Sequence, residues 1–512
     1  MANHSTSDSR WRDDARFLLP CLAVALLLRL WFFNGVSLHD DVNYWMQSIA
    51  TGLHGAWPPL ATHWHTRIGF VLPCAVLLKI FGLHVWVPYV FTVAGGLAEV
   101  ALTFYLARQF VPVATARLAA WLCAFYPLDI LYSSYLFTDL WAGVITAVSL
   151  FYWYRALTSD RARDYALASL FFGLAWLCRE TIVLCAPIYL VLWLHAGRWR
   201  RPQLLWALPP GLAILAGEAA LYHFTIGNWH YRLDSITASK GQLMGDLEGA
   251  GNLWTGPLKE LVTSHELGLY MLGGLVVCVG RFGRVPRVLG LWLLTGFIWM
   301  SWGTTMPTAW VPLLPDPRYL SIVTIPCMVV LAIFFRGIRS PVWRAALVGA
   351  LIVIGLLGVA ADYGDTKLTA HRKFVASVYN QPETALEPFV YFGARAAQDF
   401  RPAEARYACA TDLGRVSMID LVGNLPAVRT MTSGEARYLA LSEDLQPEKW
   451  RKKLAEGWRK VEEIPGESRW TRRHLSQLLA ACGLGAVFAD NVPALLILEN
   501  PRWPAAASAL PR

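Results

Sequence analysis

Two adjacent carboxylates, Asp40 and Asp41, follow the first strongly apolar stretch of the chain, at residues 17–36. Aromatic side chains come after them, in SLHDDVNYWMQSIATG. Neighbouring carboxylates repel each other, and an apolar layer disfavours charge, so one of the pair should be protonated more easily than a free carboxylate. Such a group can accept a proton from a hydroxyl group. The alternative is that either residue caps the helix expected to follow.

The next polar segment, ATHWHTRIG, offers a cation and two residues of a metal-ligating type. Arg67 can hold a phosphate through two parallel hydrogen bonds, or it can anchor the chain at a membrane surface. His63 and His65 can ligate a divalent metal ion. Trp64 would separate the two histidines on a strand, and their angle on a helix is poor. Binding of phosphate or substrate is the expectation for Arg67, with anchoring at the membrane surface as the alternative. Whether His63 and His65 ligate a metal stays open.

Charged residues also stand at the edges of later apolar stretches. Asp139, in YSSYLFTDL, begins one of them and either binds substrate or caps the helix, with Thr138 as the alternative cap. Arg179 and Glu180, in LCRET, occupy a very tight turn. They either pair with each other or line a cavity, since charges at membrane depth commonly do so.

Arg318 and Tyr319 begin a late apolar stretch in PLLPDPRYLSIVTIP. Arg318 can bind a lipid phosphate, or its long side chain can extend to the membrane surface. Three charged residues lie inside apolar stretches, and the sequence names no partner for them: Arg29, Glu99 and Glu218.

The composition is that of a membrane protein. Of 512 residues, 55% are hydrophobic and 16% charged, whereas soluble domains are about 25% charged. The 24 tryptophans suit the two membrane–water interfaces, where amphipathic rings gather. The net charge of +9 does not indicate a nucleic-acid partner, because no basic patch interleaved with aromatic residues lies on a soluble segment.

The pattern predicts an α-helical polytopic membrane protein with about 11 transmembrane helices. The expected spans are residues 17–36, 85–107, 118–133, 140–157, 165–178, 181–196, 203–222, 267–280, 288–302, 319–335 and 343–361. Residues 68–82 contain Pro73 and Lys79 and should form a helix lying at the membrane surface. Counting that helix as a span would break the arginine bias of the inner loops.

This topology places the N terminus inside and the C terminus outside. Residues 1–361 form the transmembrane domain, with long outer loops at 37–84 and 223–266 that hold most of the 12 histidines. Residues 362–512 should form a small C-terminal α/β domain outside the membrane. Strands are expected in YACATDLGRVSMIDLVG and ALLILENP, and an amphipathic helix in PEKWRKKLAEGWRKV. Whether Cys409 and Cys482 pair stays open.

Taken together, these segments resemble the GT-C superfamily of polyprenyl-phosphate-dependent glycosyltransferases. The most similar groups are the family-39 protein mannosyltransferases and the lipid A aminoarabinose transferases. Four features carry the resemblance: the Asp40-Asp41 pair, the segment TRIGFVLPCAVLLKIFG, the outer aspartate of YLFTDL and the Arg-Tyr of PRYLSIVTIP. The resemblance covers about residues 15–335.

The resemblance implies inverting transfer of a sugar from a polyprenyl-phosphate carrier to the hydroxyl of a glycan, lipid or protein. Asp40 would act as the base or orient the acceptor, and Arg318 would neutralise the leaving phosphate. Arg67 and Arg179 are expected to assist, with Asp139, Glu180 and Tyr319 also expected in the substrate site. The outer segments lack an N-glycosylation sequon, and the basic residues are mostly Arg. A bacterial inner membrane with a periplasmic active face is therefore expected.

Two other functions fit part of the pattern. A glycan polymerase or ligase would also use outer arginines, but it would extend or attach whole chains. A lipid-linked sugar transporter or flippase commonly shows repeated halves and polar groups open to both sides. This sequence shows no repeat, and its polar residues gather on one side.

Overall fold

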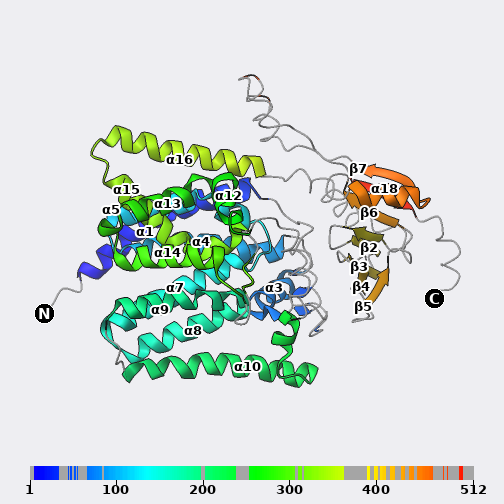
Figure 1. Cartoon of the computed structure of the whole chain (residues 1–512), viewed down its shortest axis with the longest axis horizontal. Coiled ribbons are helices and arrows are strands. Elements are labelled where there is room, and N and C mark those ends of the chain that lie inside the picture. The colour runs from blue at the N-terminus through cyan, green and yellow to red at the C-terminus, as the bar shows by residue number, and fades with distance from the viewer. Residues whose placement is uncertain are drawn as a thin grey trace. The chain divides into compact units, whose positions relative to one another are not determined.

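The structure is a computed structural model of the chain (Figure 1). It describes residues 5–33, 44, 47–48, 51–52, 55, 66–82, 86–197, 202–237, 253–305, 310–313, 316–362, 389–392, 397–401, 404–410, 415–420, 428–432, 438–442, 447–464, 477, 481 and 495–499. The chain divides into two compact units. The first comprises Met1–Phe33, Thr66–Phe70 and Tyr89–Val359, and the second comprises Asn34–His65, Val71–Pro88 and Ala360–Arg512.

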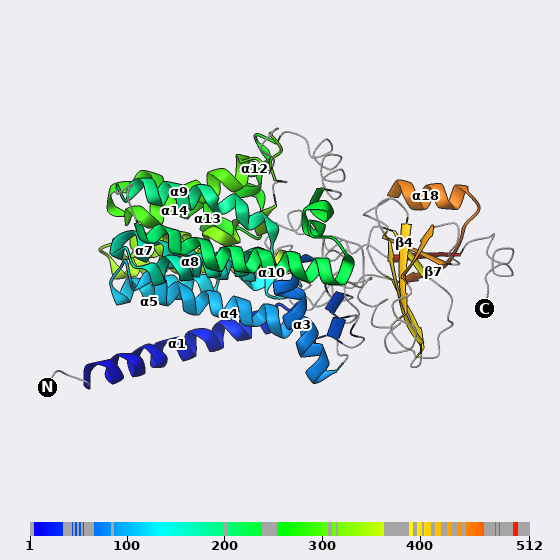
Figure 2. The same ribbon diagram turned by 90° about the horizontal axis from the view of Figure 1, so that it is seen from below.

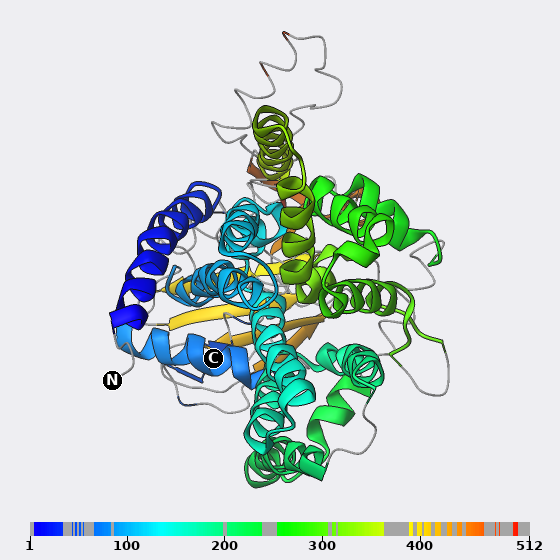
Figure 3. The same cartoon turned by 90° about the vertical axis from the view of Figure 1, so that its left-hand side faces the viewer.

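Helices make up the first unit, and many of them run side by side with similar axes (Figures 2 and 3). Among the described residues up to 362, the α-helices include α1 (Ser5–Trp31), α3 (Ile68–Phe81), α4 (Val87–Ala107), α5 (Val113–Ala124), α6 (Pro127–Tyr132), α7 (Asp139–Ser159), α8 (Ala162–Cys178), α9 (Ala186–His195), α10 (Leu208–Ile226), α12 (Gly256–Thr263), α13 (Gly268–Gly280), α14 (Arg287–Trp302), α15 (Thr324–Arg336) and α16 (Pro341–Asp362). The 3₁₀ helices are η2 (Glu180–Cys185), η3 (Pro202–Ala207), η4 (Phe282–Arg284) and η5 (Pro317–Val323).

Several of these helices are apolar enough to cross a membrane. Within the described residues five segments are both long and apolar enough, and the bent pair α12–α13 would make a sixth span. The five are Val87–Ala107, Asp139–Ser159, Pro202–Ile226, Pro317–Arg336 and Pro341–Ala360. The prediction of a mostly helical membrane protein with several apolar helices is thereby confirmed. Residues 68–82, expected as a surface helix, form the 14-residue helix α3.

One of the expected spans is not a single continuous helix. Residues 118–133 do not form a single helix, because α5 ends at Ala124 and α6 begins at Pro127. Tyr126, which precedes the proline, is extended at φ −71° and ψ 123°. A proline disfavours the helical conformation of the residue before it, and its own fixed φ suits the first position of a new helix. The stretch therefore contains a helix break that its hydropathy did not indicate.

Burial is unequal among the apolar helices. In Pro317–Arg336, which ends with α15, 78% of the most apolar window is buried, and α15 packs against α5, α13 and α14. In Pro202–Ile226, which contains α10, the buried share is 6%, and in Pro341–Ala360, within α16, it is 17%. Figure 1 shows α10 and α16 on opposite sides of this helical unit. α15 is thus a central helix of the unit, whereas α10 and α16 are peripheral.

The described residues beyond 362 contain two four-stranded sheets and a helix. One sheet has the order β1-β6-β8-β7, with β1 and β6 parallel and the other neighbours antiparallel, and the second is the antiparallel meander β2-β3-β4-β5. The strands are β1 (Phe389–Phe392), β2 (Ala397–Arg401), β3 (Glu404–Ala410), β4 (Arg415–Asp420), β5 (Val428–Thr432), β6 (Tyr438–Ser442), β7 (Arg459–Ile464) and β8 (Leu495–Glu499), and the helix is α18 (Pro447–Ala455). These elements include the segments from which strands and a helix were expected.

Candidate functional site

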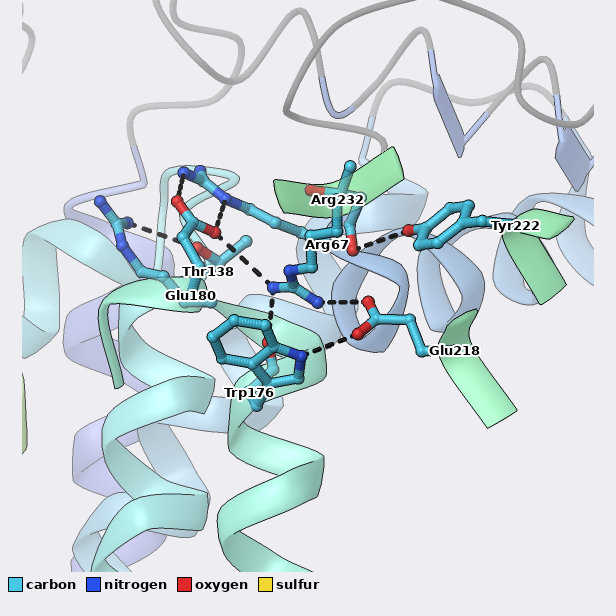
Figure 4. Close-up of polar contacts among 9 residues, drawn as sticks. Arg67, Thr138, Trp176, Glu180, Glu218, Tyr222 and Arg232 are labelled. Carbon is cyan, nitrogen blue, oxygen red and sulfur yellow. Dashed lines mark hydrogen bonds and ion pairs between the residues drawn. The ribbon is translucent and has the colours of Figure 1, made fainter. Parts of the chain in front are cut away.

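Arg67 and Glu180 form a two-pronged ion pair between distant parts of the chain (Figure 4). Arg67 Nε donates to Glu180 Oε2 at 3.1 Å, and Arg67 Nη2 donates to Glu180 Oε1 at 2.6 Å. Arg67 directly precedes α3, and Glu180 is the first residue of η2. The planar guanidinium matches the carboxylate fork, which makes this a strong and directional contact. It joins the start of α3 to the turn after α8.

A second arginine reaches the same carboxylate. Arg232 Nη2 lies 3.7 Å from Glu180 Oε2, and its other terminal nitrogen, Nη1, pairs with Glu218 on α10. Trp176, on α8, completes the arrangement. Its indole Nε1 donates to Glu218 Oε2 at 2.7 Å, its carbonyl accepts from Arg232 Nη2 at 2.6 Å, and its ring lies 4.3 Å from the Arg232 guanidinium carbon (Figure 4). Contacts between a cation and an aromatic ring add to such a network.

Asp139 and Arg179 form another buried pair, between the start of α7 and the end of α8. Arg179 also donates to the hydroxyl of Thr138 at 3.3 Å. Neither Thr138 nor Asp139 caps α7 through its side chain, so capping does not explain Asp139. Arg179 has extended backbone angles, φ −157° and ψ 130°. Since successive side chains point to opposite sides of an extended chain, Arg179 and its neighbour Glu180 bind different partners.

A close helix contact sets the position of Arg67. A Cβ atom on Gly69 would lie 2.9 Å from the backbone nitrogen of Cys178 and 2.9 Å from the carbonyl carbon of Leu177. Real Cβ atoms essentially never approach backbone atoms so closely. Glycine therefore allows the first turn of α3 to rest on the last turn of α8. This contact brings Arg67 within reach of Glu180.

We expect Gly69→Ala to separate α3 from α8 and to weaken the Arg67–Glu180 pair. Overpacking of this kind costs about 1–3 kcal/mol, so the apparent melting temperature of the purified protein should fall. The matched control is Gly217→Ala in α10, where an added Cβ would meet nothing within 4 Å. That change should be neutral or should stabilise the helix by up to about 1 kcal/mol. Equal effects of the two substitutions would contradict the contact.

Arg318 and Tyr319 lie at the start of η5, which leads into α15. Arg318 Nε is 2.9 Å from Asp316 Oδ2. The Arg318 guanidinium carbon lies 5.2 Å from the ring centre of Phe137 and 5.4 Å from that of Tyr319. The guanidinium carbon of Arg179 lies 5.0 Å from the same Tyr319 ring. Tyr319 therefore connects the Asp139–Arg179 pair to Arg318.

The charged side chains of this region are almost all buried. Arg67, Asp139, Arg179, Glu218 and Arg232 have side chains 4–5% exposed, and that of Glu180 is 16% exposed. Burial alone would raise the pKa of the Glu180 carboxyl, but the charge of Arg67 and its hydrogen bonds, together with the charges of Arg232 and Arg179, hold it well below its ordinary value. Glu180 lies in the turn between two expected spans, and it stays ionised there.

The Asp139–Arg179 pair should be strongly coupled. Arg155 and Asp164 supply a matched control, because this pair also joins α7 to α8, at their other ends, with nitrogen and oxygen 3.6 Å apart and Arg155 44% exposed. In double-mutant cycles with Asp139→Asn and Arg179→Gln, the coupling energy should exceed about 1.5 kcal/mol. The cycle with Arg155→Gln and Asp164→Asn should give about 1 kcal/mol or less. Thermal unfolding in detergent measures both coupling energies. A larger coupling energy for Arg155–Asp164 than for Asp139–Arg179 would contradict the importance of the buried pair.

Four of the residues singled out from the sequence lie outside the described residues: Asp40, Asp41, His63 and His65. The acidic pair and the open metal site therefore remain predictions. Within the part of the chain that the structure describes, no group of three or more His, Cys, Asp and Glu side chains has the arrangement of a metal site. The structure brings together the other predicted residues, Arg67 and Glu180 in one cluster and Asp139, Arg179, Tyr319 and Arg318 in the adjoining one.

Sequence reasoning missed two members of the first cluster and found no partner for a third. Glu218 was noticed as a charge inside an apolar stretch but without a partner, whereas Arg232 and Trp176 were not singled out. One signal was available in the sequence: a charge inside an apolar stretch needs a partner of opposite sign. The sequence could not say which arginine supplies it, because Arg232 lies beyond the end of α10, in a separate helical segment at residues 231–237.

Arg29 is the centre of a different buried group. Its guanidinium donates to the Ser133 hydroxyl at 3.0 Å and to the carbonyls of Ala25, Ala124 and Gly96 at 3.1, 3.5 and 3.4 Å. These contacts join α1 to α4, to the end of α5 and to the residue after α6. Arg29 thus has a structural partner set of its own, apart from the clusters around Glu180 and Asp139.

Comparison with known proteins adds a family match. Residues 69–219 match the family model of dolichyl-phosphate-mannose-protein mannosyltransferases. This segment includes Asp139, Arg179, Glu180 and Glu218. The predicted resemblance to protein mannosyltransferases is thereby confirmed over this segment. No match was found among curated proteins.

Solved structures with a similar arrangement include ArnT from Cupriavidus metallidurans bound to undecaprenyl phosphate. It is 17% identical with a TM-score of 0.49, and the match covers 72% of this chain and 70% of that one. The apo oligosaccharyltransferase of Archaeoglobus fulgidus is 14% identical, with a TM-score of 0.43 and coverage of 72% and 60%. AglB from the same organism, in complex with an inhibitory peptide and a dolichol-phosphate, is 12% identical, with a TM-score of 0.40 and coverage of 72% and 60%.

Proposed function

We propose that this protein is a membrane glycosyltransferase that moves a sugar from a polyprenyl-phosphate carrier to an acceptor hydroxyl. The family match over residues 69–219 supports the reaction class. The observation that carries the proposal is the Arg179–Tyr319–Arg318 arrangement beside Asp139. It places two guanidinium groups around one aromatic ring at the entry to a largely buried apolar helix. Such a site can hold a phosphate whose lipid tail lies in the membrane.

The proposed reaction is a single displacement. The acceptor oxygen forms a bond to the anomeric carbon of the sugar while the bond from that carbon to the phosphate oxygen breaks. The electron pair of the broken bond stays on the phosphate, and the acceptor proton passes to Asp40. Because attack occurs opposite the leaving group, the anomeric configuration inverts. Glycan, lipid and protein hydroxyls are all acceptors compatible with this chemistry.

Each described residue has a proposed role in that displacement. Arg318 is the least buried of the arginines in the two adjoining clusters, with a side chain 18% exposed, and it would meet the phosphate first. Its guanidinium would stabilise the charge that develops as the phosphate leaves, an effect that is strong in a water-poor site. Arg179 is already paired with Asp139, so it would add positive potential from behind Tyr319. Arg67 and Glu180 would hold the turn that carries Arg179.

We also propose the membrane arrangement that this reaction needs. The broken pair α5–α6 and the shorter helices α8, α9, α13 and α14 would cross the membrane with the longer helices α1, α4, α7, α10, α15 and α16. This arrangement gives about 11 spans with the N terminus inside. Residues 1–361 would form the transferase domain, and residues 362–512 a small α/β domain outside. The active face would be periplasmic in a bacterial inner membrane. Fusions of a periplasm-dependent reporter enzyme after residue 362 should be active, and fusions after residue 197 should be inactive.

The decisive experiment follows a radiolabelled sugar. The purified protein in proteoliposomes would be given polyprenyl-phosphate sugars together with a membrane extract as the source of acceptors. Label should move to an acceptor, one sugar at a time, and the product should have the inverted configuration. Movement of labelled lipid across the bilayer without transfer, for every donor tried, would overturn the proposal in favour of a transporter. Attachment of whole chains would instead indicate a polymerase or ligase.

A further inference from the structure

The buried group around Arg29 also contains two carboxyl groups. Arg29 lies on α1, Glu99 on α4 and Asp129 on α6, and none of these three residues is more than 1% exposed. The positive charge of Arg29 acts on both carboxyl groups. Arg29 and Glu99, two charges for which the sequence named no partner, thus meet around Asp129, away from the clusters that hold Glu180 and Asp139.

The charges of this group do not balance when both carboxyl groups are ionised. Two carboxylates beside one guanidinium leave one negative charge in excess, in a region closed to solvent. Within the described part of the chain, no lysine, histidine or second arginine acts on Glu99 or Asp129. A buried charge without a counter-charge is strongly destabilising. One further positive charge must therefore belong to the group.

The contact between the two carboxyl groups shows where that charge is needed. The side chains of Glu99 and Asp129 are hydrogen-bonded to each other. Ionised carboxylates can only accept hydrogen bonds, so such a contact requires a proton on one of them. One buried oxygen of each group, Glu99 Oε2 and Asp129 Oδ1, also has no donor among the described residues. A single proton held between the two groups supplies both the missing donor and the missing charge.

The other titratable side chains in and around the pair are neutral hydrogen-bonding groups. The Cys123 thiol donates to Asp129 Oδ2 at 3.5 Å, and the Tyr126 hydroxyl is buried near both carboxyl groups with no hydrogen-bond partner among the described residues. Thiols and phenols are uncharged at neutral pH, so they can donate a hydrogen bond but cannot balance a carboxylate. By element, the titratable groups are Cys21 and Arg29 on α1, Glu99 on α4, Cys123 on α5, Tyr126 and Asp129 before and on α6, Tyr270 on α13 and Cys327 on α15.

A proton fits this place better than a metal ion. Among the described residues, no group of three or more His, Cys, Asp and Glu side chains has the arrangement of a metal site, and this includes Glu99, Cys123 and Asp129. The guanidinium of Arg29 also repels a second cation. A proton needs no coordination shell, and the hydrogen-bonded carboxyl groups already lie close enough to share it.

We propose that Glu99 and Asp129 form a proton-binding site inside the helical unit, in which the two carboxyl groups share one proton and Arg29 balances the remaining negative charge. The site goes beyond the proposed transferase function and does not depend on it. With the proton bound, the group is neutral as a whole. This neutrality allows three ionisable side chains from α1, α4 and α6 to stay together in the interior at neutral pH.

Infrared spectroscopy of the purified full-length protein, in a detergent without ester groups, detects the proton directly. A protonated carboxyl group has a carbonyl stretching band that carboxylates lack, and the wild type should show it at neutral pH. Glu99→Gln and Asp129→Asn should each abolish the band, because the remaining carboxyl group ionises beside Arg29. The matched control is Asp164→Asn, which removes a buried carboxylate already paired with Arg155 and should keep the band. Absence of the band from the wild type, or its retention in both single variants, would overturn the proposal.

The melting temperatures of the same variants give an independent readout. Each single variant should be tolerated, because its amide replaces the protonated carboxyl group and one carboxylate still balances Arg29. The double variant Glu99→Gln/Asp129→Asn should lose far more than the sum of the single effects, since Arg29 then has no counter-charge.

A rescue variant keeps this result interpretable if the double variant fails to fold. Adding Arg29→Met to the double variant should restore much of the melting temperature, because no buried charge remains. Additive effects of the two single substitutions would show that both carboxyl groups are protonated in the wild type and would overturn the sharing of one proton. A wild-type melting temperature that rises with sodium concentration, without the carbonyl band, would assign the missing charge to a metal ion instead.

Discussion

Glu180→Gln should destabilise the protein by about 3–5 kcal/mol, the typical cost of removing one partner from a buried ion pair. Glu180 receives two hydrogen bonds from Arg67 and lies 3.7 Å from Arg232. Without its charge, Arg67 and Arg232 each lose one oppositely charged neighbour, although Arg232 keeps Glu218. Glutamine keeps the shape of the side chain and one acceptor oxygen, so the loss of stability would measure the contribution of the charge. The apparent melting temperature in detergent is the measurement.

The effect should depend on pH in a defined direction. The pKa of Glu180 in the folded protein lies well below its ordinary value of 4.5. A carboxyl with a lowered pKa contributes stability that is complete above its unfolded pKa and is lost as the pH falls toward its folded pKa. The difference between wild type and Glu180→Gln should therefore be constant from pH 8 to about pH 5.5. It should narrow only below about pH 4.5.

An exposed pair provides the control for this prediction. Asp13 and Arg16 on α1 are 4.0 Å apart with side chains 65% and 81% exposed, and pairs of this kind contribute about 0–1 kcal/mol. Asp13→Asn should shift the melting temperature little at any pH. If Glu180→Gln were equally mild, the Glu180 cluster would not hold the turn that carries Arg179, and its proposed role would fail.

Asp40→Asn should abolish sugar transfer while leaving membrane insertion and melting temperature unchanged. If Asp40 is the base that takes the acceptor proton, its amide cannot replace it, and the rate should fall about 10²–10⁴-fold. Initial rates of transfer from a polyprenyl-phosphate sugar in proteoliposomes measure the change. Donor affinity should be retained, because the donor phosphate is proposed to bind at Arg318.

Asp41→Asn is the matched comparison for Asp40→Asn, since it changes the neighbouring residue in the same way. A smaller loss is expected there, because the resemblance assigns the base to the first member of the pair. Full activity of Asp40→Asn would refute the proposed mechanism. Equal and complete loss in both variants would show instead that the pair acts as a unit.

Much of the helical architecture could be predicted from the sequence, because membrane helices are recognised by their hydropathy. Apolar stretches locate helices whether or not their partners are known, so α4, α7 and α16 lie close to their expected places. The break at Pro127 was missed because hydropathy averages over a window and does not register one constrained dihedral angle. The 3₁₀ turns before α9, α10 and α15 were missed for the same reason.

The candidate site was predicted by residue type but not by pairing. Arg179 and Glu180 were marked as charges at membrane depth, and their partners follow from three-dimensional contacts between α7, α8 and α3. The tight turn left open a pairing of the two residues with each other, but the extended backbone at Arg179 directs them to different partners. Gly69 carried no recognisable signal, because a close contact between two helices depends on the path of both.

The unequal burial of α15, α10 and α16 has a consequence for how this sequence can change over evolutionary time. A residue on α15 must fit the side chains of three neighbouring helices, so most exchanges there would require a compensating change elsewhere. In the proposed membrane arrangement α10 and α16 mainly face fluid lipid tails, which accommodate leucine, valine or phenylalanine alike. We therefore expect related sequences to drift freely in residue identity along these two outer helices while their hydropathy stays fixed, with Glu218 on α10 as the exception.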